Sequence, residues 1–264
     1  MTQTLVMAAE QRQADRDQAA AVGEAEGRAT LALLRQLRGD DWQRRTDATE
    51  WDVRTLVSHL VAQAEDALRL RTLLRRELVG RLHRRGRIPV DAHMAVGVDE
   101  HRSDQGPELV ERFAVLWPRA VHARWRQPAL VRRAPMSLGM PGVPRVRVAY
   151  LLDVILNRDL WMHRVDLARA TGKLFIIAEH DRHIVAQVMR DLAVQWTAPP
   201  VALELTGPAG GAWLIGSGDP VAVVRGDAVG YLRALAGRDD NVDLELISGE
   251  RALLARLRRT RLPF

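Results

Sequence analysis

Three ionisable residues share one face of a single predicted helix, and their side chains are of types that bind metal ions. Asp159 and His163 are four residues apart, and Asp166 follows one turn later. Helical residues at this spacing lie about 5–6 Å apart at Cβ, so the carboxylate and the imidazole can reach one cation. Two interpretations remain open from this helix alone: a metal site, or an Asp–His hydrogen bond inside a core.

The predicted helix spans residues 150–172, YLLDVILNRDLWMHRVDLARATG, and ends at a Gly suited to a left-handed cap. The face within about 60° of Asp159 is apolar at its ends and ionisable in its middle. Its members are Val148, Leu152, Ile155, Leu156, His163, Asp166 and Ala170. Burying two carboxylates and an imidazole there costs several kcal/mol unless they are paired or bound to a cation. A purely structural role would be an expensive choice.

A second candidate ligand lies on an earlier predicted helix, for which Asp52 is a good N-cap. His59 is at the polar edge of the apolar stripe of that helix, where a histidine is typically a hydrogen-bonded boundary residue. Glu179 and His183 repeat the carboxylate and His spacing further along the chain. Polar neighbours favour an exposed helix start for that pair.

Composition limits the classes of protein to which the chain can belong. It has 264 residues, enough for two medium domains, which we expect, or for one large domain. It has no cysteine, which excludes disulfides and thiolate metal sites, so any nucleophilic thiol must come from a ligand. No run of 18 apolar residues occurs, and the N-terminus lacks the order of a signal peptide. We therefore predict a soluble cytoplasmic protein with no membrane partner.

The formal charge of +6 comes almost wholly from arginine, because Lys173 is the only lysine. The basic segments, residues 69–87 and 251–261, carry little aromatic interleaving and match no groove-reading motif. We predict no nucleic-acid partner.

The pattern of elements predicts an α+β protein. Residues 1–20 are polar and rich in Gln and Ala, which is typical of a flexible tail. Residues 21–173 carry four helical patterns and one long connection over residues 80–105 that has room for one short helix, as in a four-helix bundle. Residues 174–264 mix helical patterns with the strand-like runs VALELT, AWLIG and VAVVRG, as in a small α+β domain.

Three segments, in order and at characteristic spacing, carry a resemblance to a known family. They are WDVRTLVSHL, RDLWMHRVDLARATG and VRGDAVGYLRALAGR. In these the chain resembles the maleylpyruvate isomerase family of mycothiol-dependent enzymes, over nearly its whole length after residue 20. The resemblance implies a DinB-like four-helix bundle followed by a small domain related in shape to sterol carrier proteins.

The resemblance also implies a site. A divalent metal, usually zinc, would be held by His59, Asp159 and His163, although the family pattern has Glu where this chain has Asp159. Asp166 would hold the His163 imidazole, and Arg238 matches an arginine that contributes to the substrate site. The thiol of mycothiol would occupy an open metal position as thiolate, and would add to an activated double bond or displace a leaving group.

The partners implied are a small electrophilic substrate and a thiol cosubstrate, bound by a monomer or a homodimer. Two other functions remain open at this point. One is a metal-dependent enzyme of the same fold that does not use mycothiol, favoured by Asp in place of Glu at position 159. The other is a non-catalytic small-molecule binding protein. For Arg238 the alternative interpretation is a surface turn residue.

Overall fold

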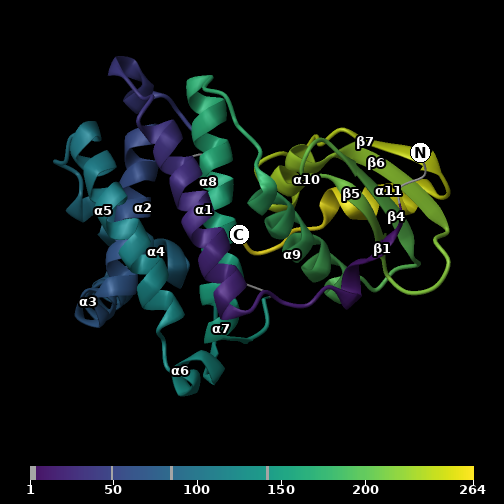
Figure 1. Ribbon diagram of the computed structural model, residues 1–264, viewed down its shortest axis with the longest axis horizontal. Coiled ribbons are helices and arrows are strands. Elements are labelled where there is room, and N and C mark those ends of the chain that lie inside the picture. Colours follow the sequence, from purple (N-terminus) through teal and green to yellow (C-terminus); the bar gives the residue numbers. More distant parts are fainter. Residues whose placement is uncertain (1–3, 49, 84–85, 141–142) are drawn as a thin grey trace. The chain divides into compact units, whose positions relative to one another are not determined.

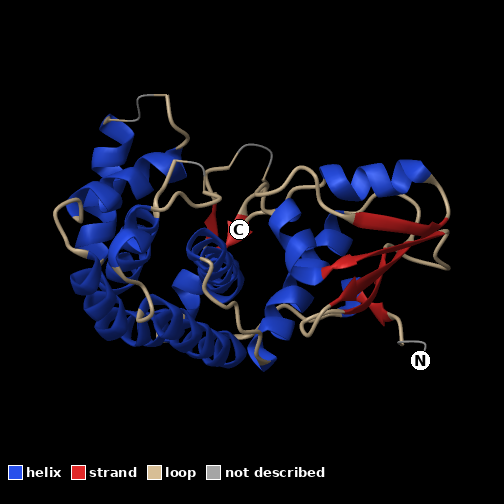
Figure 2. Cartoon of the chain, turned by 90° about the horizontal axis from the view of Figure 1, so that it is seen from above, coloured by secondary structure: helices blue, strands red, loops and turns tan. Residues whose placement is uncertain are grey.

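The structure is a computed structural model that describes residues 4–48, 50–83, 86–140 and 143–264. The chain forms two compact units (Figure 1). Residues 15–175 make up the helical unit, and residues 176–264 join residues preceding 15 in the mixed unit. All five strands of the larger sheet belong to the mixed unit (Figure 2). The expected α+β class is confirmed.

Four long helices build the helical unit. They are α1 (Arg16–Leu34), α2 (Val53–Leu68), α5 (Gly106–Trp125) and α8 (Leu156–Thr171). Helix α1 packs against both α5 and α8, and α2 packs against α5 and α8, so the four enclose one core. Leu34, Leu60, Phe113 and Leu160 are among its buried residues. This core is the rigid scaffold on which α2 and α8 present their polar side chains.

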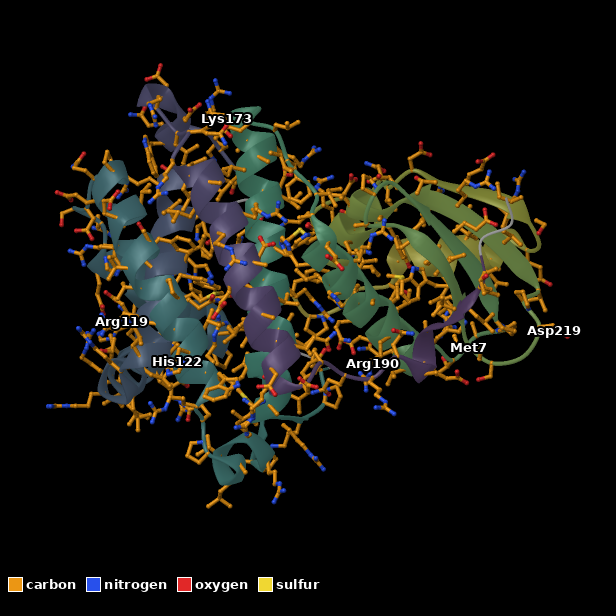
Figure 3. All side chains as sticks on the ribbon, in the orientation of Figure 1. Met7, Arg119, His122, Lys173, Arg190 and Asp219 are labelled. Atoms are coloured by element: carbon orange, nitrogen blue, oxygen red, sulfur yellow. The ribbon has the colours of Figure 1, made fainter. Side chains whose placement is uncertain are left out.

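The helix ends follow the sequence signals. Asp52 caps α2 by accepting a hydrogen bond from the Thr55 backbone N–H at 2.8 Å, as its position predicts. Gly172 ends α8 with φ 67°, the left-handed conformation for which glycine is suited. Lys173, labelled in Figure 3, follows directly, and its ammonium is 3.1 Å from a carboxylate oxygen of Asp41.

The run that leads into α8 is not a single α-helix. Helix α7 (Val148–Tyr150) passes into a π-helical turn, η3 (Leu151–Ile155), which passes into α8. Before it, α6 (Ala129–Arg133) and the short pair β2 (Pro135–Met136) and β3 (Val146–Arg147) fill the break in the helical pattern. The predicted helix over 150–172 is therefore continuous, with one wider turn near its start.

Residues 80–105 contain one helix, as the sequence allowed, but most of this stretch is helical. Helix α3 (Leu70–Leu82) and helix α4 (Pro89–Glu100) form a helical pair between α2 and α5. Pro89 stands at the first position of α4, where its missing N–H costs nothing. The glycines that suggested a loop serve packing, because a Cβ on Gly97 would lie 2.8 Å from the Cβ of Ala62 on α2.

The mixed unit holds a sheet of order β1-β5-β4-β6-β7. Its elements from residue 176 onward are α9 (Glu179–Gln195), β4 (Val201–Thr206), β5 (Gly211–Ile215), β6 (Ala222–Asp227), α10 (Ala228–Leu235), β7 (Leu244–Ser248) and α11 (Arg251–Arg259). Strand β4 is antiparallel to β5 and parallel to β6, and β7 closes the far edge antiparallel to β6. The helices and strands predicted for this part occur in the predicted order.

The expected flexible tail over residues 1–20 is wrong for its described part. Strand β1 (Val6–Met7) adds a parallel edge to the sheet, with Val6 opposite Trp213 on β5, and the turn η1 (Ala8–Glu10) buries Ala8. Helix α1 already begins at Arg16, where Asp15 caps it. A strand at a sheet edge pairs through main-chain hydrogen bonds, so the composition of residues 1–20 did not predict this strand. No helix in the described ranges has the length and apolar character needed to cross a membrane.

Candidate metal centre

Helices α2 and α8 bring the three expected ligands together. Nε2 of His163 lies 3.3 Å from Oδ1 of Asp159, and Nε2 of His59 lies 3.7 Å from Oδ2 of the same carboxylate. One ligand atom from each residue lies within 4.8 Å of the other two. Asp159 therefore stands between two imidazoles, each facing a different oxygen.

The separation of 3.3 Å between His163 and Asp159 matches that of two ligands of one cation, and the 3.7 Å between His59 and Asp159 is a few tenths of an ångström longer. In a tetrahedral zinc site with bonds of about 2.0–2.1 Å, neighbouring ligand atoms are about 3.3–3.4 Å apart. Both imidazoles are buried, yet Nε2 of His59 has no hydrogen-bond partner in the described part of the chain. A buried polar atom without a partner is costly, and a cation at the centre of the three residues would satisfy it. The donor set, two imidazoles and one carboxylate, is one that catalytic zinc sites use.

Asp166 contacts the His163 ring at Nδ1, on the side away from Asp159. Nδ1 of His163 lies 3.2 Å from Oδ2 of Asp166, whose side chain is fully buried. A carboxylate at Nδ1 keeps a proton there, so Nε2, which faces Asp159, is the nitrogen that can give up its proton and bind a metal ion. The arrangement is that of a histidine oriented to bind a metal ion.

Two further residues complete the surroundings of the site. Gln63, one turn beyond His59 on α2, donates a hydrogen bond of 2.8 Å from Nε2 to Oδ2 of Asp159. The ring of Trp51 lies over both imidazoles, with centroids 4.9 Å from His59 and 5.9 Å from His163. Neither residue was among the site residues predicted from the sequence. The available signals were the i,i+4 spacing of Gln63 from His59 and the place of Trp51 at the start of the WDVRTLVSHL segment.

His59, Asp159 and His163 shift one another's pKa values. Burial would raise the pKa of Asp159, but the facing imidazoles hold it well below its usual range. Burial would lower the pKa of His163, but Asp159 and Asp166 raise it to about 9. Burial lowers the pKa of His59, and Asp159 offsets only part of this. These shifts describe a charged Asp159–His163 pair beside a neutral His59, so a metal ion that binds Nε2 of His163 would release a proton.

The π-helical turn η3 ends four residues before Asp159. Such turns change the rotation of a helix by a fraction of a turn, and they occur frequently at functional sites. Here the turn sets which face of α8 points toward α2, and so it contributes to placing Asp159 opposite His59.

The remaining predicted residues lie in the mixed unit. Arg238 is half-buried in the turn after α10, and its backbone N–H donates to the carbonyl of Arg233 at 2.8 Å. Helix α10 is fixed at its start by Asp227, whose carboxylate accepts from the Gly230 backbone N–H at 2.7 Å. Glu179 and His183 are exposed on the first turns of α9, as their polar neighbours predicted.

Fold and site together define a class of protein: a four-helix bundle with a His–Asp–His cluster between two of its helices, joined to a small α+β unit. Two family models match the chain. One is the mycothiol maleylpyruvate isomerase N-terminal domain, over residues 23–168, and the other is the C-terminal domain of the same family, over residues 179–256. The chain belongs to the mycothiol-dependent maleylpyruvate isomerase family, as the three sequence segments indicated.

Solved structures agree in fold. The crystal structure of a mycothiol-dependent maleylpyruvate isomerase is similar with a TM-score of 0.54 and 16% identity, covering 89% of this chain and 94% of that one. A histidine-to-alanine mutant of that enzyme gives a TM-score of 0.55 and 15% identity, with the same coverage. No curated protein matches the chain significantly. At such identity the likeness concerns the fold.

Proposed function

We propose that the chain is a mycothiol-dependent metalloenzyme that acts on a small electrophile, either as an isomerase of the maleylpyruvate type or as a thiol S-transferase. The observation that carries this proposal is the convergence of His59, Asp159 and His163 on one point, where Nε2 of His59 makes no hydrogen bond to any residue that the structure describes. Family membership supports the choice of mycothiol as cosubstrate. The nucleophilic thiol must come from a ligand, because the chain has no cysteine.

Each residue has a distinct task in this proposal. His59, Asp159 and His163 hold a divalent cation, for which zinc is the first candidate, by three protein atoms and leave a further position open. When bound, that cation supplies the positive charge that keeps a thiol deprotonated at neutral pH. Asp166 keeps the His163 ring in the required tautomer, and Gln63 holds one oxygen of Asp159 by its 2.8 Å hydrogen bond.

Arg238 is proposed to bind a carboxylate of the substrate. Its guanidinium can form two parallel hydrogen bonds to a carboxylate, a geometry that lysine cannot reproduce. Arg238 lies on a turn held by the Arg233 carbonyl, while the Arg233 side chain pairs with Asp239 at 3.0 Å. Arg233 is therefore already paired with the carboxylate of Asp239.

The proposal is tested by turnover with purified, metal-loaded protein. We expect mycothiol-dependent conversion of maleylpyruvate or mycothiol-dependent alkylation by a small electrophile, and loss of that turnover by at least 10²-fold in His59→Ala. His101→Ala, a buried histidine of the same unit outside the site, is the matched control and should stay active. Turnover that continues without any thiol would favour the metal-dependent alternative. A protein that neither holds metal nor binds thiol would favour the non-catalytic one.

Arg238 separates substrate binding from metal binding. Arg238→Ala should keep the metal content and reduce turnover of an acidic substrate by about 10²-fold, because a charge-assisted contact worth roughly 2–3 kcal/mol is lost. Arg238→Lys should recover little of it. Wild-type activity of Arg238→Ala toward every substrate that the protein turns over would make Arg238 a turn residue only.

A further inference from the structure

Helix α3 leaves a row of leucines in solvent. Leu70, Leu74, Leu78 and Leu82 are 67%, 58%, 60% and 71% exposed. They recur at every fourth residue, so they form one continuous ridge along the helix. Single exposed leucines are common on protein surfaces, but a contiguous apolar ridge marks an interaction surface.

The opposite face of α3 is already in use. Arg76 and Gly80 are buried there, and the Arg76 guanidinium donates to the carbonyl of Ala62 on α2 at 2.8 Å. A Cβ on Gly80 would lie 3.0 Å from the backbone of Ala92 on α4. The helix is therefore fixed to its own unit by one face and presents the leucine ridge outward in a defined orientation.

The sequence of α3 is nearly symmetric about Arg76. Read from either end, LRTLLRRELVGRL places Leu at the first and fifth positions and Arg at the second. Leu70 thus corresponds to Leu82, and Leu74 corresponds to Leu78. At the centre, Arg75 corresponds to Glu77, a pair of opposite charge.

We propose that α3 forms a homodimer interface by packing antiparallel against α3 of a second copy about a two-fold axis near Arg76. Two-fold interfaces join the same patch of both subunits, so each residue meets its counterpart in the symmetric pattern. Leu70 then meets Leu82 of the second copy, Leu74 meets Leu78, and Arg75 lies near Glu77. Ridges of residues four apart interlock when the two helices cross at about −50°.

The exposed area suits a reversible dimer. Four leucine side chains about two thirds exposed offer on the order of 450 Å² per copy, and the stems of Arg71, Arg75 and Arg81 extend this toward the ~800 Å² per partner of a standard interface. We expect dissociation constants on the order of 1–100 μM.

Charge distinguishes a second copy from an anionic membrane. Arg71 and Arg81 correspond across the axis, and Arg81 is paired with Glu77 of its own helix at 2.9 Å. The rim of the dimer thus carries an excess of positive charge, so added salt should strengthen the association by screening it. Attraction of the same arginines to anionic lipid would weaken with salt.

The test is sedimentation of the full chain at concentrations from about 1 to 200 μM. Wild type should show a monomer–dimer equilibrium that tightens with salt, and Leu74→Glu with Leu78→Glu should weaken it at least 10-fold. Leu130→Glu, at a leucine of α6 that is 84% exposed, is the matched control and should change nothing. Circular dichroism checks that each variant folds.

The antiparallel direction of the two α3 helices is tested by disulfide crosslinking. The result is unambiguous because the native chain has no cysteine. A mixture of Leu70→Cys and Leu82→Cys should give a disulfide-linked heterodimer under mild oxidation, whereas each variant alone should not crosslink. A monomeric wild type at 200 μM, a dimer unaffected by Leu74→Glu with Leu78→Glu, or salt-sensitive binding of a monomer to phosphatidylserine vesicles would overturn the proposal.

Discussion

Helix α2 contributes to two clusters of buried and half-buried polar side chains, and they differ in how their charges are matched. The first contains His59 and Gln63, which face Asp159 and His163 of α8. The second surrounds Arg76 of α3. That guanidinium contacts Glu65 and Asp66 of α2 and Glu100 of α4, and two histidines flank the same acids.

In the second cluster every acid has a basic counterpart on another element. His93 reaches Asp66 at 2.8 Å, and His101 lies between Glu65 at 3.2 Å and Asp104 at 2.8 Å. Its contacts join α2, α3 and α4, so it closes the helical pair onto the bundle. In the first cluster, ligand atoms converge on one point, and Nε2 of His59 has no partner among the described residues.

The comparison shows that histidines and carboxylates near one another do not by themselves mark a site. In the second cluster even Nδ1 of His93, which makes no hydrogen bond among the described residues, lies 3.4 Å from a carboxylate oxygen of Glu77, and the charges are spread over several pairs. The first cluster differs because its three ligand atoms converge on one point, where a cation could bind all of them. His93 and His101 lie in the part of the chain that the sequence assigned to a connection, and both belong to this network of ion pairs.

The largest expected effect separates the two clusters by metal content. Wild type should hold about one divalent ion per chain, and His163→Ala should hold less than about a tenth of that, because one of three protein ligands is lost. His101→Ala should keep the full content and lose stability instead. Elemental analysis of the purified variants measures both. Full metal content in His163→Ala would place the metal elsewhere in the chain.

An intermediate effect concerns the stability of the paired network. Burial would raise the pKa of Glu65, but hydrogen bonds from His101 and Arg76 lower it to about 2. Because the pKa of Glu65 is depressed in the folded state, its ionised carboxylate stabilises the fold above about pH 4.5. This stabilisation is lost as pH falls toward 2. Glu65→Gln should therefore cost about 2–3 kcal/mol at pH 6, with metal content unchanged.

His101 sets the upper limit of the same pH window. The hydrogen bond to Glu65 raises the pKa of His101 above its ordinary value, with burial opposing and Asp104 assisting. That stabilisation is complete below about pH 6.5 and is lost as pH rises through the raised pKa. The difference between wild type and Glu65→Gln in urea denaturation should thus be greatest between about pH 4.5 and 6.5. If the difference in the free energy of unfolding between the two proteins is constant from pH 4 to 9, the ion pairs of this network do not stabilise the fold as predicted.

The smallest expected effect is at Asp159, the proposed ligand that departs from the family pattern. Asp159→Glu should keep metal affinity or raise it by a few fold, since the longer side chain is the one that the family resemblance associates with this position. Competition with a chelator measures the change. A loss of both folding and metal binding would mean that the pocket, including the hydrogen bond from Gln63, is built around the shorter acid.

The sequence predicted local features well because their causes are local. The spacing of Asp159 and His163 on one helical face, the cap at Asp52 and the end at Gly172 all depend on helix periodicity and on backbone preferences of single residues. The succession of helices and strands along residues 174–264 was predicted for the same reason, but the order of the strands in the sheet was not. The packing of residues 80–105 was not predicted, because Gly97 and His93 on α4 are placed for contacts with other helices that no local pattern contains.

The pairing of distant segments was decided by the tertiary structure. From the residues alone His59 is a histidine at the edge of an apolar stripe, and only the family resemblance named it a ligand. Its position 3.7 Å from Asp159 depends on how α2 packs beside α8 and on the π-helical turn before Asp159. Likewise, β1 joins the sheet through main-chain hydrogen bonds that cannot be predicted from its side chains. A sequence encodes the period of each element directly, but which faces meet depends on the packing of the whole core, which no local pattern contains.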